Sequence, residues 1–431
     1  MTKDKIKIGI MGFGTVGTGA YEILRKNEDA LKKQIGAAII VEKILVKDLN
    51  KKRAVFVPDE LLTTNADDIL ENTEIDIVVE LMGGVEPAYS YIIKALDNCK
   101  HIVTANKELL AKKGNAVFEI ADKKGLAVEF EASVCGGVPV IKAFRRTLNT
   151  DRINRIMGIV NGTTNYILTK MAEEGSDYEE VLEEAKAKGY AETDPTADVE
   201  GYDAAYKMAI LASIGFHMNV DINKVSREGI SNISKRDIEY GKDLGWTIKL
   251  IGMAQEIDGK VEVGVSPMML PAAHPMATVG GVNNAVFVNS ESVGELMFYG
   301  PGAGQMPTGN SVASDIVEIA KQIALGNKQL LDCDCNENKE FMDEVHSCYY
   351  IRMDVENRPG VFAKIAGVFG NFEVSLESVL QKKTKGESAE IVLITSKVNE
   401  KSLKKAVDSI KALDVVNQVF NVIRVEGNGM N

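Results

Sequence analysis

Short apolar runs alternate with amphipathic, charged stretches along the first third of the chain. The run Lys5–Met11 reads KIKIGIM, and comparable runs recur at 37–46, 75–81, 101–104 and 126–130. Stretches with helical periodicity separate them, the first roughly at 18–33 and another near 88–98. Strands that alternate with crossover helices predict an α/β fold with a parallel, doubly wound sheet, in which ligands bind at the carboxyl ends of the strands.

The pattern changes near residue 152. A strand at 153–160 leads into helical sequence, and 246–299 is rich in strands and turns. We also expect a helix at 222–230, and a helix around 311–325 that returns to cover the first domain. This order is typical of a separate α+β domain.

The residues from 349 to 425 carry a third pattern. Strands are expected at 349–355, 374–381, 389–395 and 416–425, with helices at 361–369 and 400–413. The order βαββαβ is that of a ferredoxin-like unit. Because this part contains no cluster of paired carboxylates, we interpret it as a binding or regulatory appendage.

Composition narrows the class of protein. At 431 residues the chain is long enough for two or three domains. Its 45% hydrophobic and 26% charged residues are typical of a globular protein, and no apolar run has the length of a membrane span. The net charge of −12 disfavours nucleic acid and anionic membranes as partners. Five scattered cysteines, and a start that leads directly into a strand, predict a cytoplasmic protein without a signal peptide.

Glycines mark the turn after the first strand. They form G-x-G-x-x-G between a strand and a helix, the context that is typical of dinucleotide binding. Gly12 allows a tight turn, Gly14 lets the backbone approach a pyrophosphate, and Gly17 lets helix and strand pack closely. We expect the cofactor to contact Gly12, Phe13, Gly14, Thr15, Val16 and Gly17.

The turn after the second strand bears on the choice of cofactor. It contains Asp48 together with Lys47, Lys51, Lys52 and Arg53. An acidic residue here binds the ribose hydroxyls of NAD, whereas basic residues favour the extra phosphate of NADP. The cations favour NADP, with NAD still possible, and a solvated basic turn is the alternative.

Carboxylates gather just before a lysine in the segment 189–207, GYAETDPTADVEGYDAAYK. Asp203 and Lys207 are four residues apart, so they share one face of a helix that is too hydrophobic to lie on a surface. Either the two residues form an ion pair that only neutralises their own charges, or Lys207 is a catalytic lysine whose pKa is tuned by carboxylates. Lys107 is a second candidate, because it follows the strand 101–104 at the edge where ligands bind.

Several motifs follow one another along the chain: GFGTVG at 12–17, TANKEL at 104–109, EASVCGGVPV at 131–140, NGTTN at 161–165, the segment 189–207 and GPGAG at 300–304. Over nearly the whole chain they resemble the homoserine dehydrogenase family, in its form with a C-terminal ACT domain. The resemblance implies reversible, NAD(P)H-dependent reduction of L-aspartate 4-semialdehyde to L-homoserine, in the biosynthesis of threonine, methionine and isoleucine.

The resemblance also implies domain limits. They are a Rossmann domain at 1–135 with a helix at about 305–328, a substrate-binding, catalytic and dimerisation domain at 136–304, a linker at 329–347, and a regulatory ACT domain at 348–427. ACT domains commonly pair, so a homodimer or homotetramer is expected.

Residue roles follow from the same resemblance. Lys207 would donate and accept the proton at the reacting oxygen, and Lys107 would bind that oxygen or the cofactor. Glu192, Asp198 and Asp203 would hold the substrate's ammonium group and orient Lys207. Gly189 and Gly304 would approach the nicotinamide.

Two further sites are implied. Glu131 and the carbonyls of Val134, Gly136 and Val138 would bind a sodium ion, although from the residues alone this segment also fits a crossover loop. In the sequence NRPG, residues Asn357, Pro359 and Gly360 would bind an amino-acid effector, which we expect to be inhibitory threonine.

Two rival functions are open at this point. An aldehyde dehydrogenase with a covalent intermediate would need a reactive thiol, for which Cys135 is the candidate near a strand end. A nucleotide-binding amino-acid sensor without catalysis would need no paired lysines and carboxylates.

Overall fold

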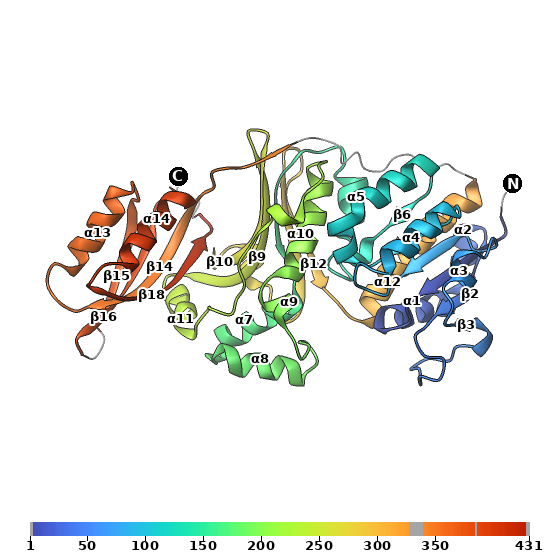
Figure 1. Ribbon diagram of the computed structural model, residues 1–431, viewed down its shortest axis with the longest axis horizontal. Helices are drawn as coiled ribbons and strands as arrows, with labels where there is room; N and C mark the ends of the chain where they lie inside the picture. Colours follow the sequence, from blue (N-terminus) through green and yellow to red (C-terminus); the bar gives the residue numbers. More distant parts are fainter. Residues whose placement is uncertain (1–2, 327–338, 384–385, 428–431) are drawn as a thin grey trace.

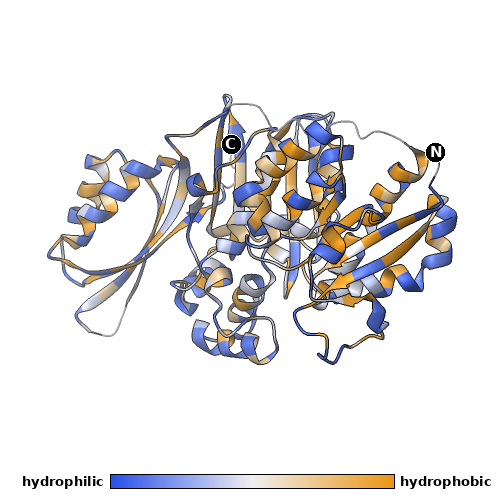
Figure 2. Ribbon diagram, turned by 45° about the vertical axis from the view of Figure 1, so that its right-hand side comes forward, coloured by the Kyte–Doolittle hydropathy of each residue, from blue (hydrophilic) through white to orange (hydrophobic). Residues whose placement is uncertain are grey.

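The computed structural model describes residues 3–326, 339–383 and 386–427 of the chain. Figure 1 shows three parts in a row: an N-terminal part in blue, which is the predicted nucleotide-binding part, a central part in green and yellow, and a C-terminal part in orange and red. Strands run through all three parts, and hydrophobic residues are concentrated on these strands and on the helix faces that cover them (Figure 2).

The first part is built on a parallel sheet of six strands. Their spatial order is β3-β2-β1-β4-β5-β6. The strands are β1 Lys5–Met11, β2 Ala38–Leu45, β3 Leu62–Thr63, β4 Ile77–Glu80, β5 His101–Thr104 and β6 Val128–Glu129. The order reverses direction between β1 and β4, which is where a doubly wound sheet opens a crevice for a ligand. The predicted fold of this part is confirmed.

Helices cover both faces of this sheet. They are α1 Thr15–Lys26, α2 Glu28–Ile35, α3 Asp67–Leu70, α4 Ala88–Asp97 and α5 Lys107–Lys124, with a 3₁₀ turn at Asp59–Leu61. The single helix expected at 18–33 is two helices, because the chain leaves helical geometry at Asn27, with φ −107° and ψ 15°. Asn27 serves as the C-cap of one helix and the N-cap of the next.

Helix α12, Gln305–Leu325, returns from the end of the central part to the first sheet. It packs against α1 at a very short distance, because a Cβ on Gly19 would lie 2.0 Å from the carbonyl oxygen of Gln305. A Cβ on Gly309 would lie 2.6 Å from the backbone nitrogen of Ala20. The expected return of this helix is therefore observed, and glycines on both helices permit it.

The central part is a mixed sheet with helices on one face. Its strands are β7 Ile153–Ile159, β8 Ser226–Arg227, β9 Trp246–Ile257, β10 Lys260–Pro271, β11 Asn283–Ser290 and β12 Gly294–Pro301. Its helices are α6 Val140–Lys142, α7 Gly162–Glu174, α8 Tyr178–Ala187, α9 Thr196–Val199, α10 Tyr202–Gly215 and α11 Lys235–Asp243. Short 3₁₀ turns lie at Glu131–Ser133, Ile222–Lys224 and Pro275–Thr278, and a π-helical turn lies at Ala143–Thr147.

The prediction of a helix at 222–230 is wrong. Only Ile222–Lys224 turns, as a 3₁₀ helix, and Ser226–Arg227 then forms β8 beside β10. Tertiary pairing with Gly264 and Val265 outweighs the local helical pattern.

The C-terminal part has the predicted βαββαβ order. Its elements are β14 His346–Glu356, α13 Val361–Asn371, β15 Leu376–Lys383, β16 Ser388–Thr395, α14 Glu400–Lys411 and β18 Val416–Val425. Two short strands accompany it: β17 Val398–Asn399 pairs with β14, whereas β13 Glu340–Phe341 pairs with β10 of the central part. The strand order β18-β14-β16-β15 is that of a ferredoxin-like sheet.

The central and C-terminal sheets are continuous. Strand β18 runs parallel to β10, with Met268 beside Arg424 and Met269 beside Val425. Within the described residues the two parts thus share one sheet of 12 strands. None of the helices in these ranges is both long and apolar enough to cross a membrane.

Candidate active site

The glycine turn after β1 is shaped for a phosphate ligand. Gly12 has φ +102°, and a Cβ there would lie 2.8 Å from the carbonyl oxygen of Leu81. A Cβ on Gly17 would lie 2.5 Å from the carbonyl oxygen of Gly12. At Gly14, by contrast, no described heavy atom lies within 4 Å of the added Cβ. The backbone is therefore bare at the position where a pyrophosphate needs access, next to the N-terminus of α1.

Two lysines converge on one carboxylate between the nucleotide-binding and central parts. The Nζ of Lys207 donates to Oδ2 of Asp203 at 2.7 Å, one turn earlier on α10. The Nζ of Lys107, at the start of α5, lies 2.5 Å from Oδ1 of the same carboxylate. Lys207 also donates to the carbonyl oxygen of Val160 at 2.7 Å. Asp203 and Lys207 are buried, whereas the side chain of Lys107 is 42% exposed.

Asn161 is a member of this cluster that sequence reasoning missed. Its Nδ2 donates to Oδ1 of Asp198 at 2.7 Å and to Oδ2 of Asp203 at 2.8 Å. Its Oδ1 accepts from the backbone N–H of Thr164 at 2.9 Å and so caps α7. The motif NGTTN contains this residue, but only its capping role was predictable, because the acids that it joins come from later elements.

Electrostatics within the cluster favour the charged forms of Asp203 and Lys107. Although burial alone would raise it, the pKa of Asp203 is held well below its usual range by Lys207 and Lys107. Burial lowers the pKa of Lys107, but the charges of Asp203, Asp198 and Glu192 raise it above the ordinary value. Burial and the neighbouring charge of Asp203 raise the pKa of Asp198. Both ammonium groups thus face a carboxylate that remains ionised.

The other acids of the segment 189–207 separate into two groups. Glu192 is exposed, but its charge acts on Lys107. Asp194 accepts from the hydroxyl of Thr196 at 2.6 Å, as expected for a turn before a helix. Glu200 accepts from the hydroxyl of Ser231. Asp194 and Glu200 are thus engaged in local contacts, whereas Asp198 and Glu192 interact with the lysine cluster.

The loop after β6 lies against the segment 300–304. Gly137 donates from its backbone nitrogen to the carbonyl oxygen of Pro301 at 3.1 Å. A Cβ on Gly136 would lie 2.4 Å from the carbonyl oxygen of Gly302. Gly304 follows with φ +125° as the N-cap of α12. These glycines thus let two backbone segments, the loop after β6 and the segment 300–304, approach each other closely.

The predicted cation ligands belong to this same loop. The carboxylate of Glu131 accepts from the backbone N–H groups of Ile141 and Lys142, at 2.9 and 2.8 Å. The carbonyl oxygen of Gly136 accepts from the hydroxyl of Ser311 at 2.7 Å, and that of Val138 accepts from Val140 N–H at 2.8 Å.

Cys135 does not fit the role of a nucleophile. Its side chain is fully buried, and burial raises the pKa of the thiol to about 12. A catalytic cysteine needs access to substrate and a thiolate at working pH. Cys333 and Cys335 lie outside the described residues.

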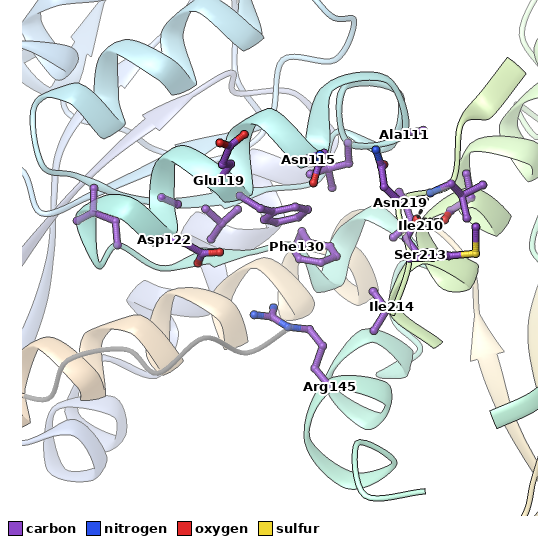
Figure 3. Close-up of a pocket in the computed structure, with 18 of the residues that line it drawn as sticks. Ala111, Asn115, Glu119, Asp122, Phe130, Arg145, Ile210, Ser213, Ile214 and Asn219 are labelled. Carbon is purple, nitrogen blue, oxygen red and sulfur yellow. Dashed lines mark hydrogen bonds between the residues drawn. The ribbon is translucent and has the colours of Figure 1, made fainter. Parts of the chain in front are cut away.

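A separate cavity of about 290 Å³ lies further along α5 and α10 (Figure 3). Its lining comes from α5, α10, the residues at and beside β6, the turn Ala143–Thr147 and the segment 218–220, and includes Phe118, Phe130, Arg145, Ile210 and Ile214. It shares the two helices with the lysine cluster but none of the predicted site residues. The same two helices therefore border both the lysine cluster and this cavity.

Comparison with known protein families assigns all three parts. Residues 12–131 match the family "Homoserine dehydrogenase, NAD binding domain", residues 139–317 match "Homoserine dehydrogenase", and residues 349–415 match "ACT domain". A homoserine dehydrogenase of Bacillus subtilis is 46% identical over 98% of this chain and 99% of its own length. The chain belongs to the homoserine dehydrogenase family. It is an NAD(P)-dependent oxidoreductase of amino-acid biosynthesis, with a C-terminal ACT domain.

Other relatives agree with the family assignment. A homoserine dehydrogenase of Neisseria gonorrhoeae is 39% identical over 98% of both chains. The crystal structure of a homoserine dehydrogenase from Thiobacillus denitrificans superposes with a TM-score of 0.93, at 38% identity, over 99% of both chains. That of the Staphylococcus aureus enzyme gives a TM-score of 0.78 at 33% identity, over 98% of this chain and 100% of its own. The rival functions, a thiol-dependent aldehyde dehydrogenase and a non-catalytic sensor, are thereby excluded.

Proposed function

We propose that Lys207 is the proton donor and acceptor of this homoserine dehydrogenase, that Lys107 binds the reacting oxygen or the cofactor, and that Asp203 holds both lysines. The observation that carries the proposal is the convergence of both Nζ atoms on Asp203, at 2.7 and 2.5 Å. An isolated ion pair at i and i+4 needs no second lysine from another domain. The arrangement therefore favours catalysis over mere charge neutralisation.

The chemistry accounts for the arrangement. A dihydronicotinamide held at the glycine turn after β1 would supply a hydride for the aldehyde carbon of aspartate semialdehyde, and negative charge would then develop on the carbonyl oxygen. Lys207 protonates that oxygen, and Lys107 stabilises the charge beside it. In the reverse direction Lys207 accepts the hydroxyl proton of homoserine. Asp203 keeps both Nζ atoms in place, whether Lys207 is protonated or neutral.

Acids near the lysines fit the amino group of the substrate. Asp198 shares Asn161 with Asp203, and Glu192 lies close enough to act on the charge of Lys107. We assign to Glu192, Asp198 and Asp203 the binding of the substrate ammonium. Neutralising Glu192 as Gln should raise KM for homoserine more than it lowers kcat, in steady-state assays.

The cofactor is assigned as NADP, with NAD as the alternative. Gly12, Phe13, Gly14, Thr15, Val16 and Gly17 would hold the pyrophosphate side, with Gly189 and Gly304 near the nicotinamide. The guanidinium of Arg53 donates to the carbonyl oxygens of Asp48, Leu49 and Lys51 at 2.8 to 3.0 Å, and so it shapes the basic turn after β2. A related archaeal enzyme, 28% identical, was solved in complex with NADPH. A kcat/KM ratio that favours NAD⁺ over NADP⁺ would contradict this assignment.

The cation and effector sites remain proposals of the same kind. Sodium would be held by Glu131 and the carbonyls of Val134, Gly136 and Val138, and activity should then depend on Na⁺ at constant ionic strength.

Threonine would bind at Asn357, Pro359 and Gly360, which are exposed between β14 and α13. Asn357→Ala should raise the threonine concentration needed for half-inhibition, while uninhibited turnover stays unchanged. Pairing of ACT domains would give a homodimer or homotetramer, which sedimentation analysis tests.

Replacing Lys207, the proposed general acid, tests the proposal directly. Lys207→Ala should lower kcat by about 10²–10⁴-fold, because the general acid is lost. The Kd for NADP⁺, measured by fluorescence titration, should stay within a small factor. The matched control is Lys170→Ala on α7, whose lysine pairs with Glu174 at the surface. Turnover that survives in Lys207→Ala would disprove the role of Lys207.

A further inference from the structure

A buried carboxylate lies at the carboxyl end of β4. Glu80 is fully buried, and its Oε1 accepts from the backbone N–H of Met82 at 2.8 Å. Its Oε2 accepts from the hydroxyl of Thr104, at the end of the neighbouring strand β5, at 2.7 Å. These partners are neutral, and desolvation raises the pKa of Glu80. Because burying a carboxylate among neutral groups costs free energy, stability alone does not account for an acid at this position.

The hydrogen bonds continue from Thr104 to Asn106. The backbone N–H of Asn106 donates to Oγ1 of Thr104 at 3.1 Å. The side chain of Asn106 then caps α5, since its Oδ1 accepts from the backbone N–H of Leu109 at 3.1 Å. Its Nδ2 donates to the carbonyl oxygen of Gly84 at 2.6 Å. The side chains of Glu80, Thr104 and Asn106 thus tie the ends of β4 and β5 to the N-terminus of α5, beside a backbone hydrogen bond from Ala105 N–H to the carbonyl oxygen of Glu80 at 3.3 Å.

Lys107 is the first residue of that helix. Its side chain is long and 42% exposed, so the position of its Nζ depends on where the helix begins. From there it reaches Asp203 on α10, at 2.5 Å. A displacement of the α5 N-terminus would be carried directly to this contact.

We propose that Glu80, Thr104 and Asn106 form a positioning chain for Lys107. The three residues set the start of α5 and the loop that contains Met82 and Gly84, and so they fix the ammonium group against Asp203. The inference rests on the role proposed for Lys107 in catalysis. Glu80 itself is a positioning residue, because it acts through the others.

The central hydroxyl offers a clean test. Thr104→Val keeps the shape of the side chain but removes both hydrogen bonds, whereas Thr104→Ser keeps them. We expect Thr104→Val to lower kcat about 10- to 100-fold, since misplacement of a catalytic group by about 1 Å has this effect. Thr104→Ser should restore turnover to near wild type. Glu80→Gln is the second variant and should lower kcat in the same direction.

The pH profile distinguishes positioning from loss of stability. If Lys107 moves away from Asp203, the charge that raises its pKa is weakened, and the alkaline limb of the kcat profile shifts to lower pH. Thr104→Val and Glu80→Gln should both show this shift, with melting temperatures measured in parallel. Lower melting temperatures with unchanged kcat and unchanged pH profiles would overturn the inference.

A double-mutant cycle separates this inference from the proposed function. Thr104→Val in a Lys107→Ala background should cost no further turnover, because the chain acts through Lys107. Full turnover in Lys107→Ala alone would disprove the proposed role of Lys107. The positioning chain would be disproved in either of two cases in which Lys107→Ala lowers kcat. In the first, Thr104→Val alone leaves kcat unchanged; in the second, Thr104→Val lowers the kcat of Lys107→Ala by its full factor.

Discussion

Asp203 is the residue on which both lysines depend. Its two oxygens contact Lys107 and Lys207, and Asn161 donates to the oxygen that faces Lys207. The i,i+4 relation of Asp203 and Lys207 was predictable from helical spacing alone. The place of Lys107 at the ligand-binding edge was predictable from its position after a strand, but its contact with Asp203 was not, because α5 and α10 come from different domains. The bridging role of Asn161 left no signal in a single sequence.

Neutralising this carboxylate should change both rate and pH dependence. Asp203→Asn removes the negative charge and replaces one carboxylate oxygen with an NH₂ group, which cannot accept from an ammonium group, so we expect kcat to fall at least about 100-fold. The pKa of Lys107 loses the charge that raises it, and the alkaline limb of the residual activity should move to lower pH. A pH–rate profile of wild type and variant measures both effects. An unchanged alkaline limb would show that Asp203 does not tune Lys107.

Helix α12 is the element that joins the end of the central part to the nucleotide-binding sheet. Asp315 on this helix is fully buried, accepts from the backbone N–H of Glu131 at 2.8 Å and pairs with Lys142 at 2.8 Å. The return of α12 was predictable from its apolar pattern and from the glycines before it. The failure at 222–230 has the opposite cause, since pairing with β10 was invisible to local periodicity.

Asp315 should make stability depend on pH. Burial raises its pKa to about 7, whereas an unfolded aspartate has a pKa of about 3.9. Between these values the folded state holds a proton that the unfolded state has released, so the free energy of unfolding falls as pH rises from about 4 to about 7. The fall is at most about 4 kcal/mol, at about 1.4 kcal/mol per pKa unit.

Asp315→Asn tests this dependence, because the amide cannot titrate. Urea unfolding at several pH values, compared with wild type, should show a flatter dependence for the variant between pH 4 and 7. Parallel curves for the two proteins would rule out Asp315 as the titrating group.

At the scale of the whole molecule, the ACT domain is joined to the central domain by more than a linker. Strands β18 and β10 pair, and Arg352 on β14 is buried against α11 of the central domain. Its Nε donates to Oδ1 of Asp237 at 2.7 Å, and its Nη1 donates to Glu390 at 3.0 Å. The ferredoxin-like fold was predictable from the strand and helix order. The continuous sheet was not, because nothing local marks β18 as a partner of β10.

Breaking this buried pair should weaken the joint. Arg352→Met leaves Asp237 buried without its cation, and we expect the free energy of unfolding to fall by about 3–5 kcal/mol. Adding Asp237→Leu to this variant should recover part of the loss, because the uncompensated charge is removed. Thermal unfolding of the two variants and wild type tests the expectation, and equal melting temperatures for all three would contradict it.

The most direct test of the central claim is a cycle of homoserine-dependent NADP⁺ reduction with wild type, Lys107→Ala, Lys207→Ala and the double variant. Two lysines that are held by one carboxylate and that act on one oxygen should behave as a unit. We therefore predict a large loss of kcat in each single variant and a double variant little worse than Lys207→Ala. Near-normal turnover in either single variant, or losses that multiply fully in the double variant, would contradict the account.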